Sequence, residues 1–163
     1  MTYSEASNSM DFTPRADLVP KDQYESHLAN FPILCTDIVM INTKGQVLLL
    51  CRNEANSDWK GKWATVGGAV KRYEPLRRAA QRIVARETGQ RHALSAFEFL
   101  GIQEFMTTVT HGISTIFKVY TDDEAVTLDN TSSECLWIEP ENITTDLLMK
   151  EYRSILRLAL RDE

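Results

Sequence analysis

The sequence has little cysteine, glycine or proline, and it has no long apolar run. Its 163 residues include three cysteines, seven glycines and five prolines, with no internal repeat or low-complexity tract. This composition excludes a fibrous protein, a disulfide scaffold and a disordered chain. No stretch approaches the run of about eighteen apolar residues that a transmembrane helix requires, so we expect no membrane contact.

The three cysteines lack the spacing of a metal site. Cys35, Cys51 and Cys135 each lie inside an apolar run, without a C-x-x-C or cysteine–histidine pattern. We therefore expect buried, reduced thiols and a cytoplasmic location. Charged residues interrupt the start of the chain, which predicts that no secretory signal peptide is present.

An excess of positive charge is also missing. The net charge is -5 at pH 7 and the pI is about 5.3, with acidic and basic residues interleaved along the chain. The chain therefore offers no general electrostatic surface for nucleic acid. An anionic ligand would need a few local arginines or a divalent cation to neutralise it.

The residues that are present predict one globular domain. A hydrophobic share of 43% and a charged share of 25% are typical of a soluble fold, and the length suffices for one core. Residues 1–18 are polar and aperiodic, which predicts a flexible N-terminal arm before a folded domain at residues 19–163.

Local patterns predict both helices and strands. Three stretches have the spacing of helices: residues 20–31, 75–89 and 144–160. Five stretches are rich in the apolar and β-branched residues of strands: 33–42, 46–52, 96–106, 114–120 and 135–138. This mixture predicts an α/β fold with a mixed sheet between helices.

Two polar residues lie on the first two expected strands. A Thr-Lys-Gly turn predicts a hairpin in which Asn42 is opposite Gly45. In that register Asp37 faces Leu50, and Asp37 and Arg52 are diagonal neighbours on one face. They form either a structural ion pair at a sheet edge or a pair that contacts a substrate.

The stretch from Gly67 to Gly89 predicts a glycine-containing loop followed by a helix. Glu87 lies about 20° from Leu76 around this helix, in the middle of its apolar stripe. Two interpretations are open. Either Glu87 bends into water at a frayed helix end, or it binds a cation that offsets its burial and the negative end of the helix dipole.

The spacing in this stretch resembles the Nudix box. Gly68 is followed after five residues by Glu74 and after seven more by Arg82, and Glu87 and Gly89 close the pattern. The resemblance implies the Nudix fold, in which a mixed sheet is sandwiched between helices. It also implies that Gly68, Glu74 and Arg82 support the box and that Arg82 braces Glu87.

The match to the box is partial. Ile83 and Arg86 stand where the family has its first two metal-binding glutamates, so only Glu87 remains. The GDP-mannose mannosyl hydrolase branch of the family has the same losses. The order of elements from residue 19 to residue 140 also resembles that branch, although Ala69 replaces an arginine there.

The resemblance to this branch implies a function. It implies a homodimeric hydrolase that splits a nucleoside diphosphate sugar of the GDP-mannose type into sugar and nucleoside diphosphate. Glu87 and the Gly67 carbonyl would hold one Mg²⁺, or Mn²⁺. Asp37 would contact the substrate, and Arg52 would contact the diphosphate and assist its departure.

The catalytic base of the branch is not present. Counted back from Trp137, the positions of its histidine and of a metal-binding glutamine are occupied by Thr131 and Ser132. Three other residues are candidates for this role: Glu104, His111 and Glu134. In the polar loop before the box, Trp59 is a candidate for stacking on a nucleotide base.

Three functions therefore stay open. The first is the Mg²⁺-dependent hydrolase of a nucleoside diphosphate sugar. The second is a catalytically weakened Nudix domain that binds a nucleotide or nucleotide sugar without turnover, which the missing base and ligands favour. The third is a Nudix pyrophosphohydrolase that attacks phosphorus and uses Glu104 as its base.

Overall fold

The structure is a computed structural model that describes residues 4, 19–53, 60–107, 110–144, 146–148 and 150–160. Apart from Ser4, the predicted arm at residues 1–18 lies outside the described residues, and so does Trp59. The elements in chain order are α1 (Lys21–Asn30), β1 (Ile33–Asn42), β2 (Val47–Arg52), β3 (Trp63–Ala64), β4 (Val66–Ala69), α2 (Leu76–Thr88), η2 (Leu94–Ala96), β5 (Glu98–Met106), β6 (His111–Thr121), β7 (Ser132–Ile138), η3 (Pro140–Asn142) and α3 (Lys150–Ala159).

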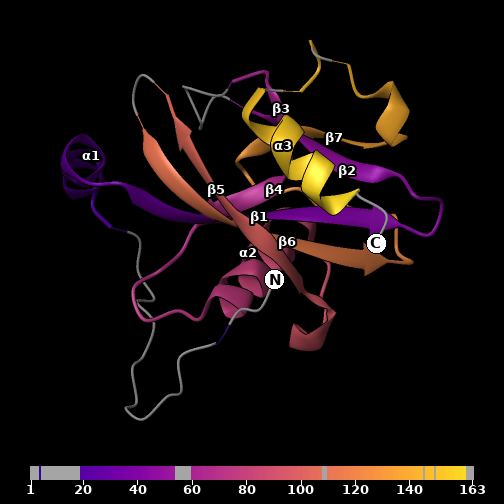
Figure 1. Cartoon of the computed structure of the whole chain (residues 1–163), viewed down its shortest axis with the longest axis horizontal. Helices are drawn as coiled ribbons and strands as arrows, with labels where there is room; N and C mark the ends of the chain where they lie inside the picture. The colour runs from indigo at the N-terminus through magenta and orange to yellow at the C-terminus, as the bar shows by residue number, and fades with distance from the viewer. Residues whose placement is uncertain are drawn as a thin grey trace.

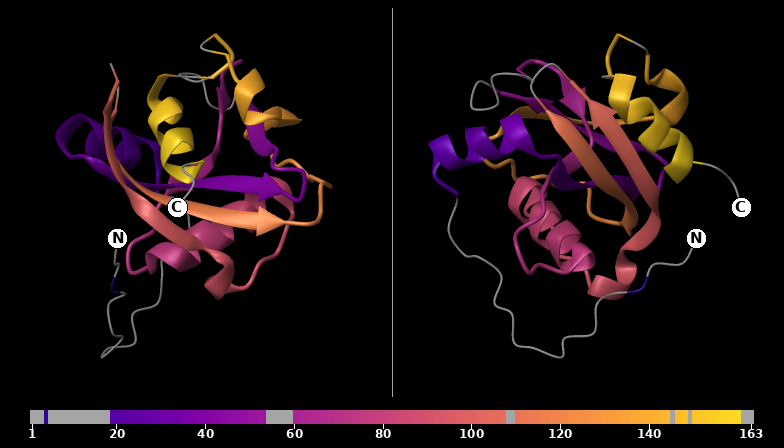
Figure 2. Two further views of the ribbon diagram at one scale, coloured as in Figure 1. Left: turned by 45° about the vertical axis from the view of Figure 1, so that its right-hand side comes forward. Right: turned by 60° about the vertical axis from the view of Figure 1, so that its left-hand side comes forward.

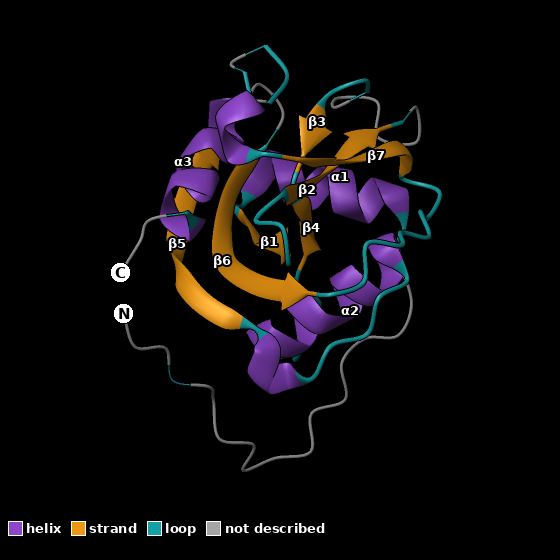
Figure 3. Cartoon of the chain, turned by 90° about the vertical axis from the view of Figure 1, so that its right-hand side faces the viewer, coloured by secondary structure: helices purple, strands orange, loops and turns teal. Residues whose placement is uncertain are grey.

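Seven strands form one mixed sheet. Its main path runs β3-β2-β1-β6-β5, with β4 paired to β1 and β7 paired to β2. β1 is parallel to β6 and antiparallel to β2 and β4. Figure 3 shows β5 and β6 as long, curved strands next to each other.

Helices α2 and α3 cover opposite faces of the sheet. Alternation along β1 points Ile38 and Met40 toward α2, where they join one buried cluster. Val39 and Ile41 point the other way and pack in a second cluster with Ile155 of α3. Figure 2, left, shows the two helices on either side of the strands. The predicted arrangement, a mixed sheet between helices, is confirmed.

The predicted helix at 75–89 is confirmed as α2, but the closing helix begins later than predicted. α3 starts at Lys150 instead of residue 144. The segment before it contains a turn, in which the Leu148 N–H donates to the Thr144 carbonyl at 3.4 Å, and Leu148 makes an isolated bridge to Trp63. His111 was expected in a loop but lies at the start of β6, where it pairs with Met106.

The predicted register of the first hairpin was wrong. Ile41 lies opposite Val47, and Asn42 is bonded to Gln46 instead of facing Gly45. The Asn42 side chain explains the difference, because its Oδ1 accepts hydrogen bonds from the backbone N–H of Gln46 at 2.9 Å and of Lys44 at 3.0 Å. This side-chain bonding makes the turn one residue longer.

The sheet forks along β1, between Ile41, which pairs with β2, and Ile38, where the pairing with β4 begins. β4 pairs with β1 in the place that the hairpin prediction gave to β2, so that Asp37 lies opposite Gly67 instead of Leu50. Arg52 lies at the end of β2, where the neighbouring strands are β3 and β7. The fork therefore separates Asp37 from Arg52 in the sheet and leaves room for side chains between the strands.

Three further features bear on the sequence predictions. All three cysteines are free, but only Cys51 is buried, whereas Cys35 is half-buried and Cys135 is exposed on β7. α1 has no buried residue and lies at one end of the molecule, apart from α2 and α3 (Figure 1). No helix in the described part of the chain is long and apolar enough to cross a membrane.

Candidate functional site

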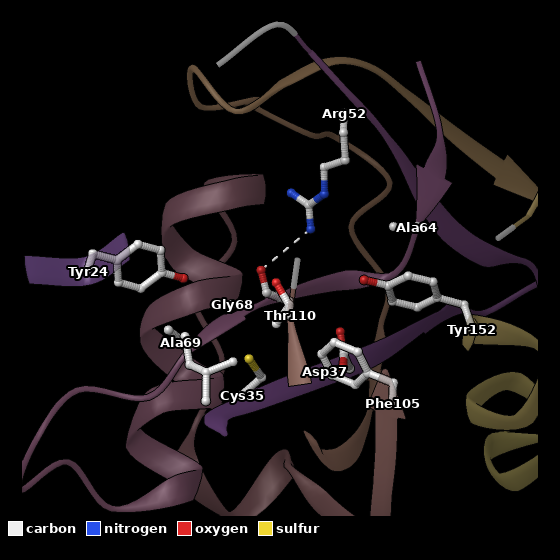
Figure 4. A pocket seen from close by; sticks show the side chains of 12 residues that line it. Tyr24, Cys35, Asp37, Arg52, Ala64, Gly68, Ala69, Phe105, Thr110 and Tyr152 are labelled. Atoms are coloured by element: carbon white, nitrogen blue, oxygen red, sulfur yellow. Dashed lines mark hydrogen bonds between the residues drawn. The ribbon is translucent and has the colours of Figure 1, made fainter. Parts of the chain in front are cut away.

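The fork of the sheet opens into a pocket. Its walls come from β1, β2, β4, the β5–β6 hairpin, α1 and α3, and its lining includes Tyr24, Cys35, Asp37, Arg52, Phe105 and Tyr152. Figure 4 shows the Arg52 guanidinium directed into this space from above and the Tyr152 hydroxyl from the right, with Asp37 below them. Asp37 and Arg52 thus share one pocket, although they are not neighbours in a hairpin.

Asp37 is a buried carboxylate at the floor of the pocket. It is 6% exposed, and its Oδ2 accepts a hydrogen bond from the Ser114 hydroxyl on β6. Burial raises the pKa of Asp37 to about 6, although the Ser114 hydrogen bond and the charge of Arg52 act in the opposite direction. The carboxyl is therefore ionised at neutral pH and can accept a proton.

Gly67 lets the backbone of β4 pass directly beside this carboxylate. A Cβ atom at Gly67 would collide with Asp37 Oδ1. The neighbouring Gly68 is less constrained, because the nearest contact of an added Cβ would be Arg86 Nη2 at 3.3 Å. The first glycine of the box loop is thus required for the packing of Asp37.

Arg52 is a buried cation on the opposite wall. Its Nη1 donates to Glu87 Oε2 at 3.2 Å and to Ser132 Oγ at 3.4 Å. Its Nη2 donates to the carbonyls of Thr65 at 3.3 Å and Gly67 at 3.5 Å. Burial is the largest influence and would lower the pKa of Arg52, but the charge and hydrogen bond of Glu87, together with Tyr152 and Asp37, outweigh it, so the pKa is raised and the group stays charged.

Glu87 lies on the buried face of α2, as the apolar stripe predicted. It is 1% exposed, which excludes the interpretation in which it bends into water. Its Oε1 accepts from Arg86 Nη2 at 2.6 Å, and its Oε2 accepts from Arg52 and from the N–H of Gly67 at 3.3 Å. Arg86 also pairs with Asp129 at 3.2 Å. Both oxygens of Glu87 thus have cationic partners.

The prediction that Arg82 braces Glu87 was wrong. Arg82 donates to Glu74 at 2.6 and 2.7 Å and to the carbonyl of Ala69 at 3.0 Å. The helix geometry explains this, because five residues correspond to about 140° around the axis, so Arg82 faces away from Glu87. Glu74 also accepts from the backbone N–H of Lys71 at 3.0 Å, and the pair ties the box loop to α2.

The structure does not bring the candidate bases to the pocket. Glu104 and His111 pair with each other across β5 and β6 at 2.8 Å, on an exposed part of the sheet. Phe105 follows Glu104 on β5 and points into the pocket, so Glu104 points to the other face of the sheet. Glu134 is exposed on β7. None of these three lines the pocket, whereas Asp37 does.

Sequence reasoning missed three residues of the site. Ser114 reaches Asp37 because β6 is parallel to β1 in a register that a sequence does not reveal. Tyr152 lies on α3 and lines the pocket, and burial and the charge of Asp37 raise its pKa. Arg86 was identified only as the residue that replaces a metal-binding glutamate. Its positive charge, next to Glu87 in the sequence, was the signal that could have predicted their ion pair.

Comparison with known proteins identifies the family. A family model described as the NUDIX domain matches residues 32–159. The chain belongs to the Nudix family. This Nudix protein is 30% identical over 128 residues to the low-salt glycan biosynthesis protein Agl8 of Haloferax volcanii, a match that covers 75% of this chain and 80% of that protein.

Solved Nudix structures have the same fold. The MutT protein of Methanosarcina mazei Go1 is 28% identical with a TM-score of 0.69, and the match covers 78% of this chain and 93% of that one. The Nudix domain of Shewanella oneidensis NrtR, solved with ADP ribose, is 17% identical with a TM-score of 0.64, and the match covers 85% and 96%. The second likeness concerns the fold alone.

Nudix hydrolases generally use divalent metal ions such as Mg²⁺. The predicted ligands Glu87 and Gly67 do lie together, but both of them already accept hydrogen bonds from Arg52. Among the described residues, no group of three or more His, Cys, Asp or Glu side chains could hold a metal ion. The donor set of the box therefore does not fit a divalent cation.

Proposed function

We propose that this Nudix protein binds a nucleoside diphosphate sugar in the pocket and hydrolyses it to sugar and nucleoside diphosphate. The observation that carries the proposal is the placement of a buried cation, Arg52, and a buried carboxylate, Asp37, in the lining of one pocket. Arginine suits a diphosphate because its planar group donates two parallel hydrogen bonds. A carboxylate ionised at neutral pH suits the activation of water.

The ligand class has two further supports. The relative from Haloferax volcanii is named for glycan biosynthesis, a process that consumes activated sugars, and the NrtR domain holds ADP ribose, a sugar linked to a nucleoside diphosphate. The pattern of box losses favours a substrate of the GDP-mannose type. The chain has a net charge of -5, so a diphosphate must be met by a local cation such as Arg52.

In the proposed reaction, Asp37 takes a proton from a water molecule as that water attacks the sugar carbon. A bond forms between the water oxygen and this carbon, while the bond from the carbon to the diphosphate oxygen breaks. The electron pair stays on the diphosphate, whose charge Arg52 offsets. Because the pKa of Asp37 is about 6, kcat/KM should rise with pH through this value.

The test is product analysis with GDP-mannose, ADP-ribose and a nucleoside triphosphate, with Mg²⁺ present. We expect sugar and nucleoside diphosphate, with oxygen-18 from labelled water in the sugar. Replacing Asp37→Asn should lower kcat about 10²- to 10⁴-fold. Glu104→Gln is the matched control, because this carboxylate lies outside the pocket, and it should retain kcat within about twofold.

Label in phosphate would instead indicate attack at phosphorus. If Glu104→Gln lost turnover while Asp37→Asn retained it, the assignment of the base to Asp37 would be wrong.

A second function, ligand binding without turnover, is favoured by one observation. Glu87, the remaining glutamate of the box, is neutralised by Arg52 and Arg86. Calorimetric binding of a nucleotide sugar, with no product after prolonged incubation, would establish this function instead of hydrolysis.

A further inference from the structure

Two cationic side chains of this protein already contact the carboxylate of Glu87. Arg86 lies 2.6 Å from one of its oxygens and Arg52 lies 3.2 Å from the other. Both cations are side chains of this protein and are held by further partners, Asp129 for Arg86 and the Thr65 carbonyl for Arg52. A divalent cation at Glu87 would therefore have to displace a guanidinium or bind against its repulsion.

The second group expected to bind an ion has the same partner. The carbonyl of Gly67 accepts from Arg52 Nη2 at 3.5 Å, while Nη1 of the same guanidinium contacts Glu87. One side chain thus contacts both donors that would have held the ion. It also lines the pocket, so a ligand in the pocket can reach it.

Arg52 can turn toward a ligand without leaving Glu87 unpaired. If its Nη1 left the carboxylate, Glu87 would keep Arg86 and the N–H of Gly67. This matters because a buried carboxylate that loses all of its partners is costly. The second arginine therefore frees the first for a role in binding.

We infer that Arg52 takes the place of the divalent cation, so that this protein binds the diphosphate of its ligand without Mg²⁺ or Mn²⁺. The inference rests on the proposed function, because it concerns the same ligand in the same pocket. It departs from the metal use that is general in the family.

The first experiment is calorimetric titration of the purified protein with GDP-mannose and ADP-ribose, in excess EDTA and again in saturating Mg²⁺. We expect the Kd of the bound sugar nucleotide to agree within about twofold between the two conditions. Binding that weakens more than about tenfold in EDTA would overturn this inference and leave the proposed function intact. Absence of binding in both conditions would overturn both.

The second experiment tests the role of Arg52 directly. In EDTA, Arg52→Gln should weaken binding at least about tenfold, whereas Arg52→Lys, which keeps the charge, should lose less. Arg78→Gln is the control, because Arg78 is exposed on α2 and should leave the Kd unchanged. Equal affinity of Arg52→Gln and wild type would contradict the inference.

A third measurement uses Mn²⁺ alone and the unmodified protein, and so does not depend on the folding of any variant. Electron paramagnetic resonance of free Mn²⁺ should show no saturable site with a Kd below about 1 mM. A saturable site with a lower Kd would overturn the inference.

Discussion

Gly67 allows β4 to pass beside the Asp37 carboxylate, and this contact sets the shape of the pocket floor. The backbone of β4 is paired with β1 at this position, so neither strand can move aside without breaking ladder hydrogen bonds. Any side chain at Gly67 must therefore push Asp37 out of its place beside Ser114.

Replacing Gly67→Ala should destabilise the protein by about 1–3 kcal/mol, because the added methyl group overpacks a buried site. Urea unfolding measures this change. Gly68→Ala is the control, since its methyl group would meet Arg86 Nη2 at 3.3 Å and Ile83 Cδ1 at 3.5 Å without a collision, and it should cost less than about 1 kcal/mol. Equal losses in both variants would show that the Asp37 contact is not the cause.

Among the elements, α2 is connected to the loop before it by the pair Glu74–Arg82. Glu74 is buried at the side chain, with 5% exposed, and it accepts two hydrogen bonds from Arg82. Arg82 also donates to the carbonyl of Ala69 at the end of β4, so the pair ties the end of β4 and the following loop to α2.

Replacing Arg82→Met should lower the free energy of unfolding by about 1–3 kcal/mol, because it leaves the partly buried carboxylate of Glu74 without its cation, with only the Lys71 N–H as a donor. Chemical denaturation gives the value. Arg78→Met, on the exposed side of the same helix, should change stability by less than about 0.5 kcal/mol. A restored stability in the double variant Glu74→Gln with Arg82→Met would support this explanation, and an additive loss would contradict it.

The sequence predicted α2 better than any other element, and the reason is local. Its apolar spacing, the position of Pro75 and the left-handed Gly89 all act within one helix, so Glu87 could be placed on the buried face before the structure was known. The identity of the Glu87 partners could not, because Arg52 is 35 residues away in sequence and reaches Glu87 only through the sheet.

The fork of the sheet could not be predicted for a related reason. A hairpin signal gives the partner of a strand near the turn, and β1 and β2 do pair there at Ile41 and Val47. It says nothing of a third strand that replaces β2 farther along, as β4 does at Asp37. Asp37 and Arg52 were therefore assigned to the same site with an incorrect pairing.

For the molecule as a whole, ionisation of Asp37 lowers stability. Its pKa is about 6 in the folded protein and 3.8 for the free side chain, with burial as the main cause. As the pH rises from about 4 to about 6, the unfolded chain releases this proton more readily than the folded one, so unfolding becomes easier. This loss of stability is absent below about pH 4 and complete above about pH 6. A buried carboxylate that lowers stability in this way is typical of a residue retained for function.

Replacing Asp37→Asn should therefore stabilise the fold relative to wild type more at about pH 8 than at about pH 4, by roughly 2–3 kcal/mol for a shift of about two pKa units. Urea unfolding of both proteins at the two pH values measures this difference. Any change in stability that the amide causes equally at both pH values cancels in the comparison. Glu104→Gln, which removes an exposed carboxylate outside the pocket, is the control variant. A gain of Asp37→Asn that is equal at both pH values would mean that the carboxyl titrates normally, and Asp37 would then be an ordinary polar residue of the pocket instead of its proton acceptor.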